Sequence, residues 1–314
     1  MKIFVTGPVP QLIKERLEEE FDILYHDSLE PLREDEILEG AKDCEGILCP
    51  LSDKITARIL TSNPQLKIVA NYGAGFDNID IQSAKEEGIV VTNAPAPSSA
   101  VSTAELTFGL LLASARHLVW GDSFMRNEKF QGWRPTFGLG HQLRGKTLGI
   151  FGLGNIGFEL AKRAEAFGMN ILYCSRSPKT TPETWLSVSF EELLMGSDFI
   201  SLHSAYAPEL HHLVDEVAFN KMKPSAIIIN AARGPLVKEE ALIQALREEK
   251  IAGAALDVYE FEPKFSKELL DFDNVILSPH LGNATYEARM EMGTNALENL
   301  LAIRDGGKAP NQVN

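Results

Sequence analysis

The chain has 314 residues, of which 44% are hydrophobic and 24% charged, so it can bury a substantial core and is not disordered. Its 30 Lys and Arg against 44 Asp and Glu give a net charge of −14, which argues against nucleic-acid or anionic-membrane partners, because both require a basic surface. Three cysteines do not make a disulfide framework and favour a reducing cytoplasm. The start of the chain does not resemble a signal peptide. The most apolar helix candidate, 106–115, is far shorter than the ~20 residues that span a bilayer.

Short β-branched runs alternate with amphipathic stretches through the first 93 residues. Strands are predicted at 3–6, 23–25, 46–48, 67–70 and 89–93, and helices at 11–21, 34–41 and from Thr56. Near-continuous apolar strands separated by helices indicate a parallel sheet that is covered on both faces.

The segment 94–99 is the best candidate for a domain boundary, because two prolines interrupt the pattern and its serines can cap the following helix. A second alternating series then begins. Its strands are predicted at 147–151, 171–173, 199–202, 226–230, 254–256 and 275–277. Six strands with intervening helices are what a doubly wound dinucleotide-binding fold requires.

A glycine-rich loop follows the first strand of this second series directly. It consists of Gly152, Leu153, Gly154, Asn155, Ile156 and Gly157, and a helix is predicted at 158–167. Such glycines allow a tight turn, close approach of a pyrophosphate and close helix–strand packing, while the helix N-terminus offers free N–H groups to phosphates. A plain strand–turn–helix is the alternative, but the strand and helix on either side favour dinucleotide binding.

The next strand ends without the acidic residue that normally binds a free ribose 2′-hydroxyl. Ser175, Arg176 and Ser177 stand there instead, and they can donate to a 2′-phosphate. NADP(H) is therefore the favoured cofactor and NAD(H) remains possible. The alternative is a solvated turn whose arginine has no specific role.

Three later segments each place a chemically useful residue after a predicted strand: Arg233, Glu262 and His280. Strand ends line the ligand crevice of an open α/β sheet, so these side chains are expected to converge. Taken singly, they could be a surface arginine, a turn carboxylate before proline and a hydrogen-bonded loop histidine.

Together these segments resemble the D-isomer-specific 2-hydroxyacid dehydrogenases over nearly the whole chain. The resemblance rests on 145–150 leading into the glycine loop, 230–236, 253–258 and Pro279-His280. It implies an α/β enzyme of two doubly wound parallel-sheet domains with the active site in the cleft between them. The implied domains are a flavodoxin-like substrate domain, 1–98 plus 285–314, and a Rossmann cofactor domain, 99–284.

The resemblance also implies that Arg233, Glu262 and His280 form the catalytic set. Arg233 can hold the carboxylate and the carbonyl of a 2-keto acid and stabilise the charge that develops on the carbonyl oxygen. Protonated His280 would supply the proton, and Glu262 would orient its imidazole and favour the charged form.

Further site residues are carried over from the family. Asp257 matches the aspartate that binds the nicotinamide carboxamide, although a strand-end cap is the alternative. The other cofactor-lining positions are Thr103, His203, Ala231, Ala232 and Gly282. The substrate-binding positions are Tyr72, Gly73 and Ala74, together with Arg233 and His280. Two glycines around Ala74 can expose N–H groups as an anion nest, and a purely structural turn is the alternative.

Within the family, position 71 helps to sort the substrate classes. It is Asn71 here, whereas phosphoglycerate and many D-lactate dehydrogenases of the family carry a basic residue at the equivalent place. Asn71 together with the NADP(H) site therefore resembles the glyoxylate, hydroxypyruvate or 2-ketogluconate reductases. The alternatives are an NAD-dependent dehydrogenase for another acid and a dinucleotide-sensing, corepressor-like scaffold. The resemblance also implies a homodimer, to whose interface the apolar helix 103–117 and the region of Trp120 and Trp133 contribute. No metal site is expected, and His211-His212 is interpreted as a helix surface.

Overall fold

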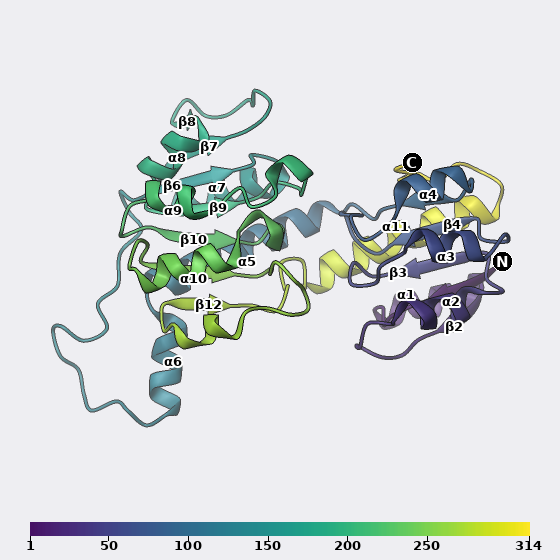
Figure 1. The fold of residues 1–314 in the computed structure, drawn as a ribbon, viewed down its shortest axis with the longest axis horizontal. Helices are drawn as coiled ribbons and strands as arrows, with labels where there is room; N and C mark the ends of the chain where they lie inside the picture. The colour runs from purple at the N-terminus through teal and green to yellow at the C-terminus, as the bar shows by residue number, and fades with distance from the viewer. The chain divides into compact units, whose positions relative to one another are not determined.

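The computed structural model describes residues 1–314, which divide into two compact units. Unit 1 comprises Met1–Ser99 and Asn283–Asn314, and unit 2 comprises Ala100–Gly282. Each unit is built on one parallel sheet with helices on both of its faces (Figure 1). The predicted α/β class with two parallel sheets is therefore confirmed.

Unit 1 contains a five-stranded sheet in the order β2-β1-β3-β4-β5. Its strands are β1 (Lys2–Val5), β2 (Asp22–Tyr25), β3 (Gly46–Cys49), β4 (Ile68–Asn71) and β5 (Val90–Thr92). Its helices are α1 (Gln11–Glu20), α2 (Glu34–Ala41), α3 (Ala57–Ser62), α4 (Ile81–Glu86) and α11 (Tyr286–Arg304). Ile3 and Val5 enter one core and Phe4 the other, because successive side chains of a strand point to opposite faces.

Unit 2 contains a seven-stranded sheet in the order β12-β11-β10-β9-β6-β7-β8. Its strands are β6 (Thr147–Phe151), β7 (Asn170–Cys174), β8 (Trp185–Ser187), β9 (Phe199–Leu202), β10 (Ile227–Asn230), β11 (Gly253–Leu256) and β12 (Val275–Leu277). The α-helices associated with it are α5 (Pro97–Ala115), α6 (Leu118–Arg126), α7 (Asn155–Ala166), α8 (Phe190–Gly196), α9 (Glu216–Lys221) and α10 (Glu239–Arg247). Three short 3₁₀ turns are η1 (Pro208–Leu210), η2 (Gly234–Leu236) and η3 (Lys267–Asp271).

The prediction of six strands for this second sheet was one strand short. The seventh strand, β8, pairs with β7 at the sheet edge and has the sequence Trp-Leu-Ser, of which only Trp185 is buried. It therefore lacks the apolar run by which the equally short edge strand β12 was recognised. The six predicted strands pair in parallel, and β10 is buried along its whole length. Ile228 packs in one core of unit 2, whereas Ile227 and Ile229 pack in the other.

Two helix starts differ from the prediction. Helix α5 begins at Pro97, so Ser98 lies inside its first turn and does not cap it. The Ser98 N–H donates instead to Glu291 at 3.0 Å, within unit 1. Helix α7 begins at Asn155, three residues earlier than predicted, and so starts inside the glycine-rich loop. The start of α5 at Pro97 is favourable, because a proline lacks the backbone N–H that would be unpaired in the first turn of a helix.

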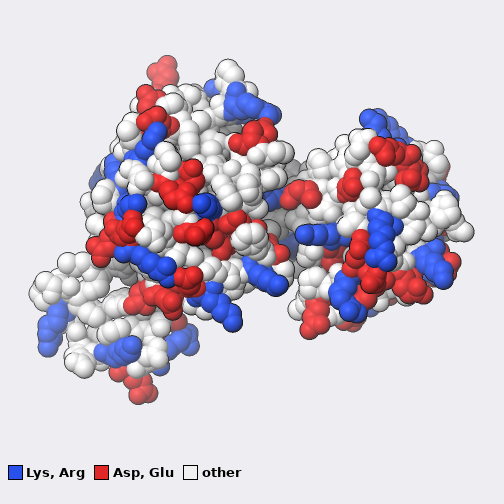
Figure 2. Space-filling view, viewed as in Figure 1, with Lys and Arg blue, Asp and Glu red and all other residues white.

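The charged surface is mixed in sign. Acidic and basic side chains are interspersed over both units on the displayed face, and the extension formed by α6 and the following loop is mostly uncharged there (Figure 2). None of the helices combines the length and the apolarity that crossing a bilayer requires. Cys44 and Cys49 are fully buried free thiols.

Candidate active site

The glycine-rich loop lies where the strand order of the unit 2 sheet reverses, between β6 and β9. Gly152 follows β6 with φ +95°, and a Cβ there would lie 2.7 Å from the backbone carbon of His203, which follows β9. Gly157 is equally constrained, because its Cβ would lie 2.4 Å from the Gly152 carbonyl oxygen. The carboxyl ends of strands at such a reversal are where dinucleotides bind in open α/β sheets.

The start of α7 has the properties of a phosphate site. Gly154 provides no side-chain cap, a Cβ at this position would meet nothing within 4 Å, and no acidic residue lies in the first helical turn. The N–H groups of Gly154, Asn155 and Ile156 donate no hydrogen bond within the protein. Unpaired N–H groups and the helix dipole favour an anion here, so the loop fits the pyrophosphate of a dinucleotide.

Ser175, Arg176 and Ser177 lie beside this loop at the end of β7. The Gly152 N–H donates to the Cys174 carbonyl at 2.9 Å, which brings the two strand ends together. No partner within the protein engages the side chains of these three residues, and Arg176 and Ser177 are exposed. The structure therefore leaves them available to a ligand group at this edge of the loop.

His203 contributes a neutral imidazole next to the loop. Its Nε2 lies 2.7 Å from the Ser201 hydroxyl oxygen, and its Nδ1 is buried with no partner. Burial lowers the pKa of His203 to about 3, so the ring is uncharged near neutral pH. The protein itself leaves this buried ring nitrogen without a partner, and the cofactor-lining role of His203 stays a prediction.

Thr103, Asp257 and Gly282 come together around one buried carboxylate. Asp257 is 1% exposed; it accepts hydrogen bonds from the Ser278 hydroxyl at 2.6 Å and from the N–H groups of Leu281 at 2.7 Å and Gly282 at 2.8 Å. A Cβ on Gly282 would lie 3.2 Å from both Asp257 Oδ2 and Thr103. Asp257 thus acts at least as a strand-end cap that fixes the segment after β12.

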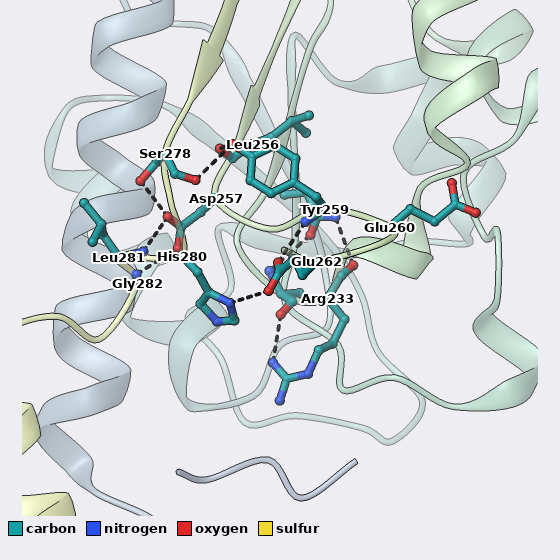
Figure 3. Close-up of polar contacts among 12 residues, drawn as sticks. Arg233, Leu256, Asp257, Tyr259, Glu260, Glu262, Ser278, His280, Leu281 and Gly282 are labelled. Carbon is teal, nitrogen blue, oxygen red and sulfur yellow. Dashed lines mark hydrogen bonds and ion pairs between the residues drawn. The ribbon is translucent and has the colours of Figure 1, made fainter. Parts of the chain in front are cut away.

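His280 and Glu262 form a pair within this framework. The imidazole Nδ1 lies 2.9 Å from Glu262 Oε2, and Glu262 Oε1 accepts the Tyr259 N–H at 2.9 Å (Figure 3). Burial raises the pKa of Glu262, but hydrogen bonding and charge from His280, the Tyr259 N–H and the charge of Arg233 together hold it below its usual range. Glu262 is therefore a carboxylate facing the imidazole.

The backbone of His280 is held in an unusual conformation. Its φ is +56°, a region that non-glycine residues seldom adopt, and its N–H donates to the Asp257 carbonyl at 2.9 Å. Such strain persists only where the surrounding structure enforces it, and it is concentrated at functional sites. Asp257 therefore positions His280 through both its main chain and its side chain.

Arg233 follows β10 and is fixed by its neighbours. Its Nη1 donates to the Ala232 carbonyl at 2.8 Å, and its own carbonyl accepts the Asn230 amide at 3.0 Å. A Cβ on Gly234 would lie 1.7 Å from the Tyr259 carbonyl oxygen, so the two chain segments touch at their backbones. Sequence reasoning did not single out this glycine, although its place between Arg233 and Pro235 is its only signal. Ala231 and Ala232 are buried beside it.

The predicted substrate-binding residues lie in unit 1, in the loop after β4. Tyr72 is buried; its hydroxyl donates to the Arg289 carbonyl and its N–H to the Cys49 carbonyl at 2.8 Å. The hydroxyl and the N–H of Tyr72 are therefore both hydrogen-bonded within unit 1. Gly73 and Ala74 differ, because their N–H groups donate no hydrogen bond within the protein.

Three carbonyls of this loop are fastened by the protein. Those of Gly73, Ala74 and Gly75 accept hydrogen bonds from the Ala94 N–H at 2.8 Å, the Asn93 amide at 2.8 Å and the Asn71 amide at 2.5 Å, respectively. In a trans peptide, each carbonyl points opposite to the next N–H, so these contacts also orient the N–H groups that follow. Neither glycine has a positive φ, so the loop is not the nest that the glycine spacing suggested.

Asn71 and Asn93 therefore support the loop from within unit 1. Asn71 is fully buried; its side-chain amide donates to the Gly75 carbonyl, and its Oδ1 accepts from the Asn78 amide at 3.2 Å, so both polar groups of the side chain bind within this region. The role of Asn93 was not apparent from the sequence, because its contact with Ala74 joins residues 19 apart in the chain. The sequence pattern placed Asn93 at the end of a predicted strand, whereas β5 ends one residue earlier, at Thr92.

The interpretation of His211-His212 as a helix surface was wrong. Both residues follow the short turn η1, and His212 has φ +56°. Their rings stack at 3.9 Å, and His212 Nε2 lies 2.6 Å from Glu260 Oε1. The two histidines stack on each other after the turn, and His212 also contacts the Glu260 carboxylate.

A glycine-rich loop at a sheet reversal, with Arg233 and a histidine–carboxylate pair at neighbouring strand ends, defines a dinucleotide-dependent oxidoreductase. The family model described as "D-isomer specific 2-hydroxyacid dehydrogenase, NAD binding domain" matches residues 108–282. The chain belongs to this family and is accordingly a dehydrogenase that acts on CH–OH donors.

Similar proteins span the whole chain. A Staphylococcus haemolyticus protein assigned to the 2-hydroxyacid dehydrogenases is 44% identical over 312 residues, which covers 98% of each chain. The crystal structure of a Thermus thermophilus protein matches with TM-score 0.95 and 39% identity, covering 100% of both chains. An NADPH-dependent glyoxylate/hydroxypyruvate reductase from Sinorhizobium meliloti, in complex with NADP and malonate, matches with TM-score 0.87 and 32% identity, covering 99% of this chain and 96% of that one.

Proposed function

We propose that this dehydrogenase reduces a small 2-keto acid with NADP(H), with Arg233, Glu262 and His280 as its catalytic set. The observation that carries the proposal is the 2.9 Å contact between His280 Nδ1 and the Glu262 carboxylate, close enough to Arg233 for its charge to act on Glu262. The preferred substrates are glyoxylate, hydroxypyruvate and 2-ketogluconate.

The chemistry of the three side chains suits such a reduction. When bound, the nicotinamide supplies a hydride to the carbonyl carbon, and negative charge then develops on the carbonyl oxygen. Arg233 stabilises that oxygen electrostatically, and His280 donates the proton. Glu262 holds the imidazole through Nδ1, which leaves Nε2 as the nitrogen that delivers the proton. In the oxidative direction, neutral His280 accepts the proton.

The loop at 73–76 supports recognition of an acid. The N–H groups of Gly73 and Ala74, which donate no hydrogen bond within the protein, can donate to the carboxylate of the substrate, and Asn71 provides no positive charge for a phosphate. Together with the likeness to a glyoxylate/hydroxypyruvate reductase, this favours a small unphosphorylated keto acid.

The cofactor preference rests on the three side chains after β7. Ser175 and Ser177 can donate to a 2′-phosphate, and the guanidinium of Arg176 can pair with it in a bidentate manner. No acidic side chain stands there to accept from a free 2′-hydroxyl. The Sinorhizobium reductase is itself described as NADPH-dependent.

The test is a panel of initial rates with glyoxylate, hydroxypyruvate, 2-ketogluconate, pyruvate and phenylpyruvate, each with NADPH and with NADH. We expect rapid NADPH oxidation with one of the first three acids, and its loss in Arg233→Ala. Faster turnover with NADH throughout would refute the NADP(H) preference and leave the dehydrogenase class intact. Turnover only with phenylpyruvate would refute the substrate class.

We also propose a cytoplasmic homodimer whose interface is formed mainly by the expected region of Trp120 and Trp133, and less by the helix 103–117. Phe108, Leu110 and Leu111 of α5 are already buried in the core of unit 2. Exposed apolar side chains lie instead on α6 and the loop that projects beyond it (Figure 1). They are Leu118, Val119, Met125, Phe130, Trp133, Phe137 and Leu139. Sedimentation of a monomer at micromolar concentration would contradict this proposal.

A further inference from the structure

One buried carboxylate fastens the chain segment that carries Glu262. Glu239, at the start of α10, is 5% exposed. Its Oε1 accepts the Glu260 N–H at 2.8 Å, and its Oε2 accepts the Ser266 N–H at 2.9 Å. Glu262 lies between these two attachment points, so both ends of its segment are tied to a single side chain.

Glu260 in turn accepts a hydrogen bond from the backbone of Glu239. Its Oε2 accepts the Glu239 N–H at 2.9 Å, and its Oε1 lies 2.6 Å from His212 Nε2. Figure 3 shows the Glu260 side chain extending away from His280, whereas that of Glu262 turns toward it. Glu260 is therefore not a second acid at the imidazole.

The same network reaches the segment that carries Arg233. The His212 N–H donates to the Pro235 carbonyl at 2.8 Å, two residues after Arg233. Gly234 also abuts the Tyr259 backbone directly. Glu239, Glu260 and His212 thus join the two segments that present Arg233 and Glu262.

A carboxylate is suited to this task in a way that its uncharged analogue is not. Two oxygens can accept from two separate N–H groups, whereas a glutamine offers one oxygen and turns an NH₂ group toward the other donor. Burying a carboxylate costs free energy, which the charge-assisted hydrogen bonds from the backbone offset. A buried polar network that is fully paired specifies one geometry for the chain around it.

We propose that Glu239 and Glu260 are positioning residues for the reaction, which set the Glu262 carboxylate against Nδ1 of His280. The proposal rests on the catalytic roles proposed for Glu262 and His280. Neither Glu239 nor Glu260 touches the reacting atoms in this scheme; each acts through Glu262.

The experiment is a double-mutant cycle on the keto-acid reductase activity of the full chain. We expect Glu239→Gln to lower kcat about 10- to 30-fold while the KM for the keto acid and the KM for the cofactor change less than about twofold. In Glu239→Gln combined with Glu262→Gln, kcat should match that of Glu262→Gln alone, because residues that act through one another are not additive. The matched control is Glu240→Gln, which removes the same charge from the exposed neighbouring position.

The outcomes separate the two proposals. If Glu262→Gln itself retains full activity, the proposed role of Glu262 fails and this inference fails with it. If Glu262→Gln is impaired but Glu239→Gln is not, or if the two effects multiply, only the positioning role is overturned. If Glu239→Gln does not fold, Glu260→Gln is judged by the same criteria, with NADPH binding and thermal unfolding as checks on its fold.

Discussion

The contact between Glu262 and His280 makes a quantitative prediction for Glu262→Gln. The carboxylate accepts from the Tyr259 N–H through Oε1 and faces the His280 Nδ1 through Oε2, each at 2.9 Å. A glutamine can keep only one of these contacts. If its oxygen stays on Tyr259, its NH₂ group faces Nδ1 and opposes a protonated imidazole; if it flips, the NH₂ group faces the Tyr259 N–H.

The size of the effect follows from the type of bond that is lost. A hydrogen bond to a charged group contributes about 1.5–3 kcal/mol. The side chains of His280 and Glu262 are 39% and 36% exposed, so solvent screens the charge–charge attraction beyond that bond. With each 1.36 kcal/mol equal to tenfold in rate, kcat for reduction should fall roughly 10- to 200-fold at pH 7. Cofactor affinity should change little, because the glycine-rich loop is untouched.

The assay measures NAD(P)H oxidation at saturating keto acid, with fluorescence titration of the cofactor and thermal unfolding as companions. Glu240→Gln serves as the control for loss of a negative charge. A kcat within threefold of the unmodified enzyme, in a variant that folds and binds cofactor normally, would refute the argument that Glu262 orients and charges the imidazole.

Three further variants test other parts of the structure. Gly234→Ala should lower both the melting temperature and kcat, the latter at least tenfold, because its Cβ would lie 1.7 Å from the Tyr259 carbonyl oxygen; unchanged kinetics would contradict the close packing. Asn93→Ala removes the amide that holds the Ala74 carbonyl, so initial rates should show a roughly fivefold higher KM for the keto acid and little change in kcat. Burial raises the pKa of Asp53, so the folded state holds its proton more tightly than the unfolded state and stability declines as pH rises above the ordinary carboxyl pKa. Urea unfolding at pH 4 and pH 8 measures the free energy of unfolding of Asp53→Asn minus that of the unmodified protein. This difference should be more positive at pH 8 than at pH 4, and the same difference at both pH values would contradict the reasoning.

Local patterns were sufficient to predict the sheets and the glycine-rich loop. Strands such as β6 and β9 are short apolar runs bounded by glycine or polar residues, and their bounds match the predicted ones. The loop at Gly152 lies directly between a strand and a helix, as its spacing indicates. The physical reason is that periodicity and backbone freedom are properties of consecutive residues. β8 was missed because only one of its three residues, Trp185, is buried, so it has no apolar run, whereas the equally short β12 reads Val-Ile-Leu.

The supporting contacts of the candidate site could not be predicted in the same way, because each joins residues that are distant in the chain. From the sequence, Glu239 looks like an ordinary acidic residue in the first turn of a helix. Such a residue would be exposed to solvent and would interact favourably with the positive end of the helix dipole. Only the fold shows that its carboxylate is buried and binds N–H groups 21 and 27 residues further on. The sequence therefore indicates which side chains can perform the chemistry, and the tertiary contacts decide whether those side chains are held rigidly enough to do so. A variant that spares Arg233, Glu262 and His280 but loosens this network should accordingly lose rate before it loses substrate affinity.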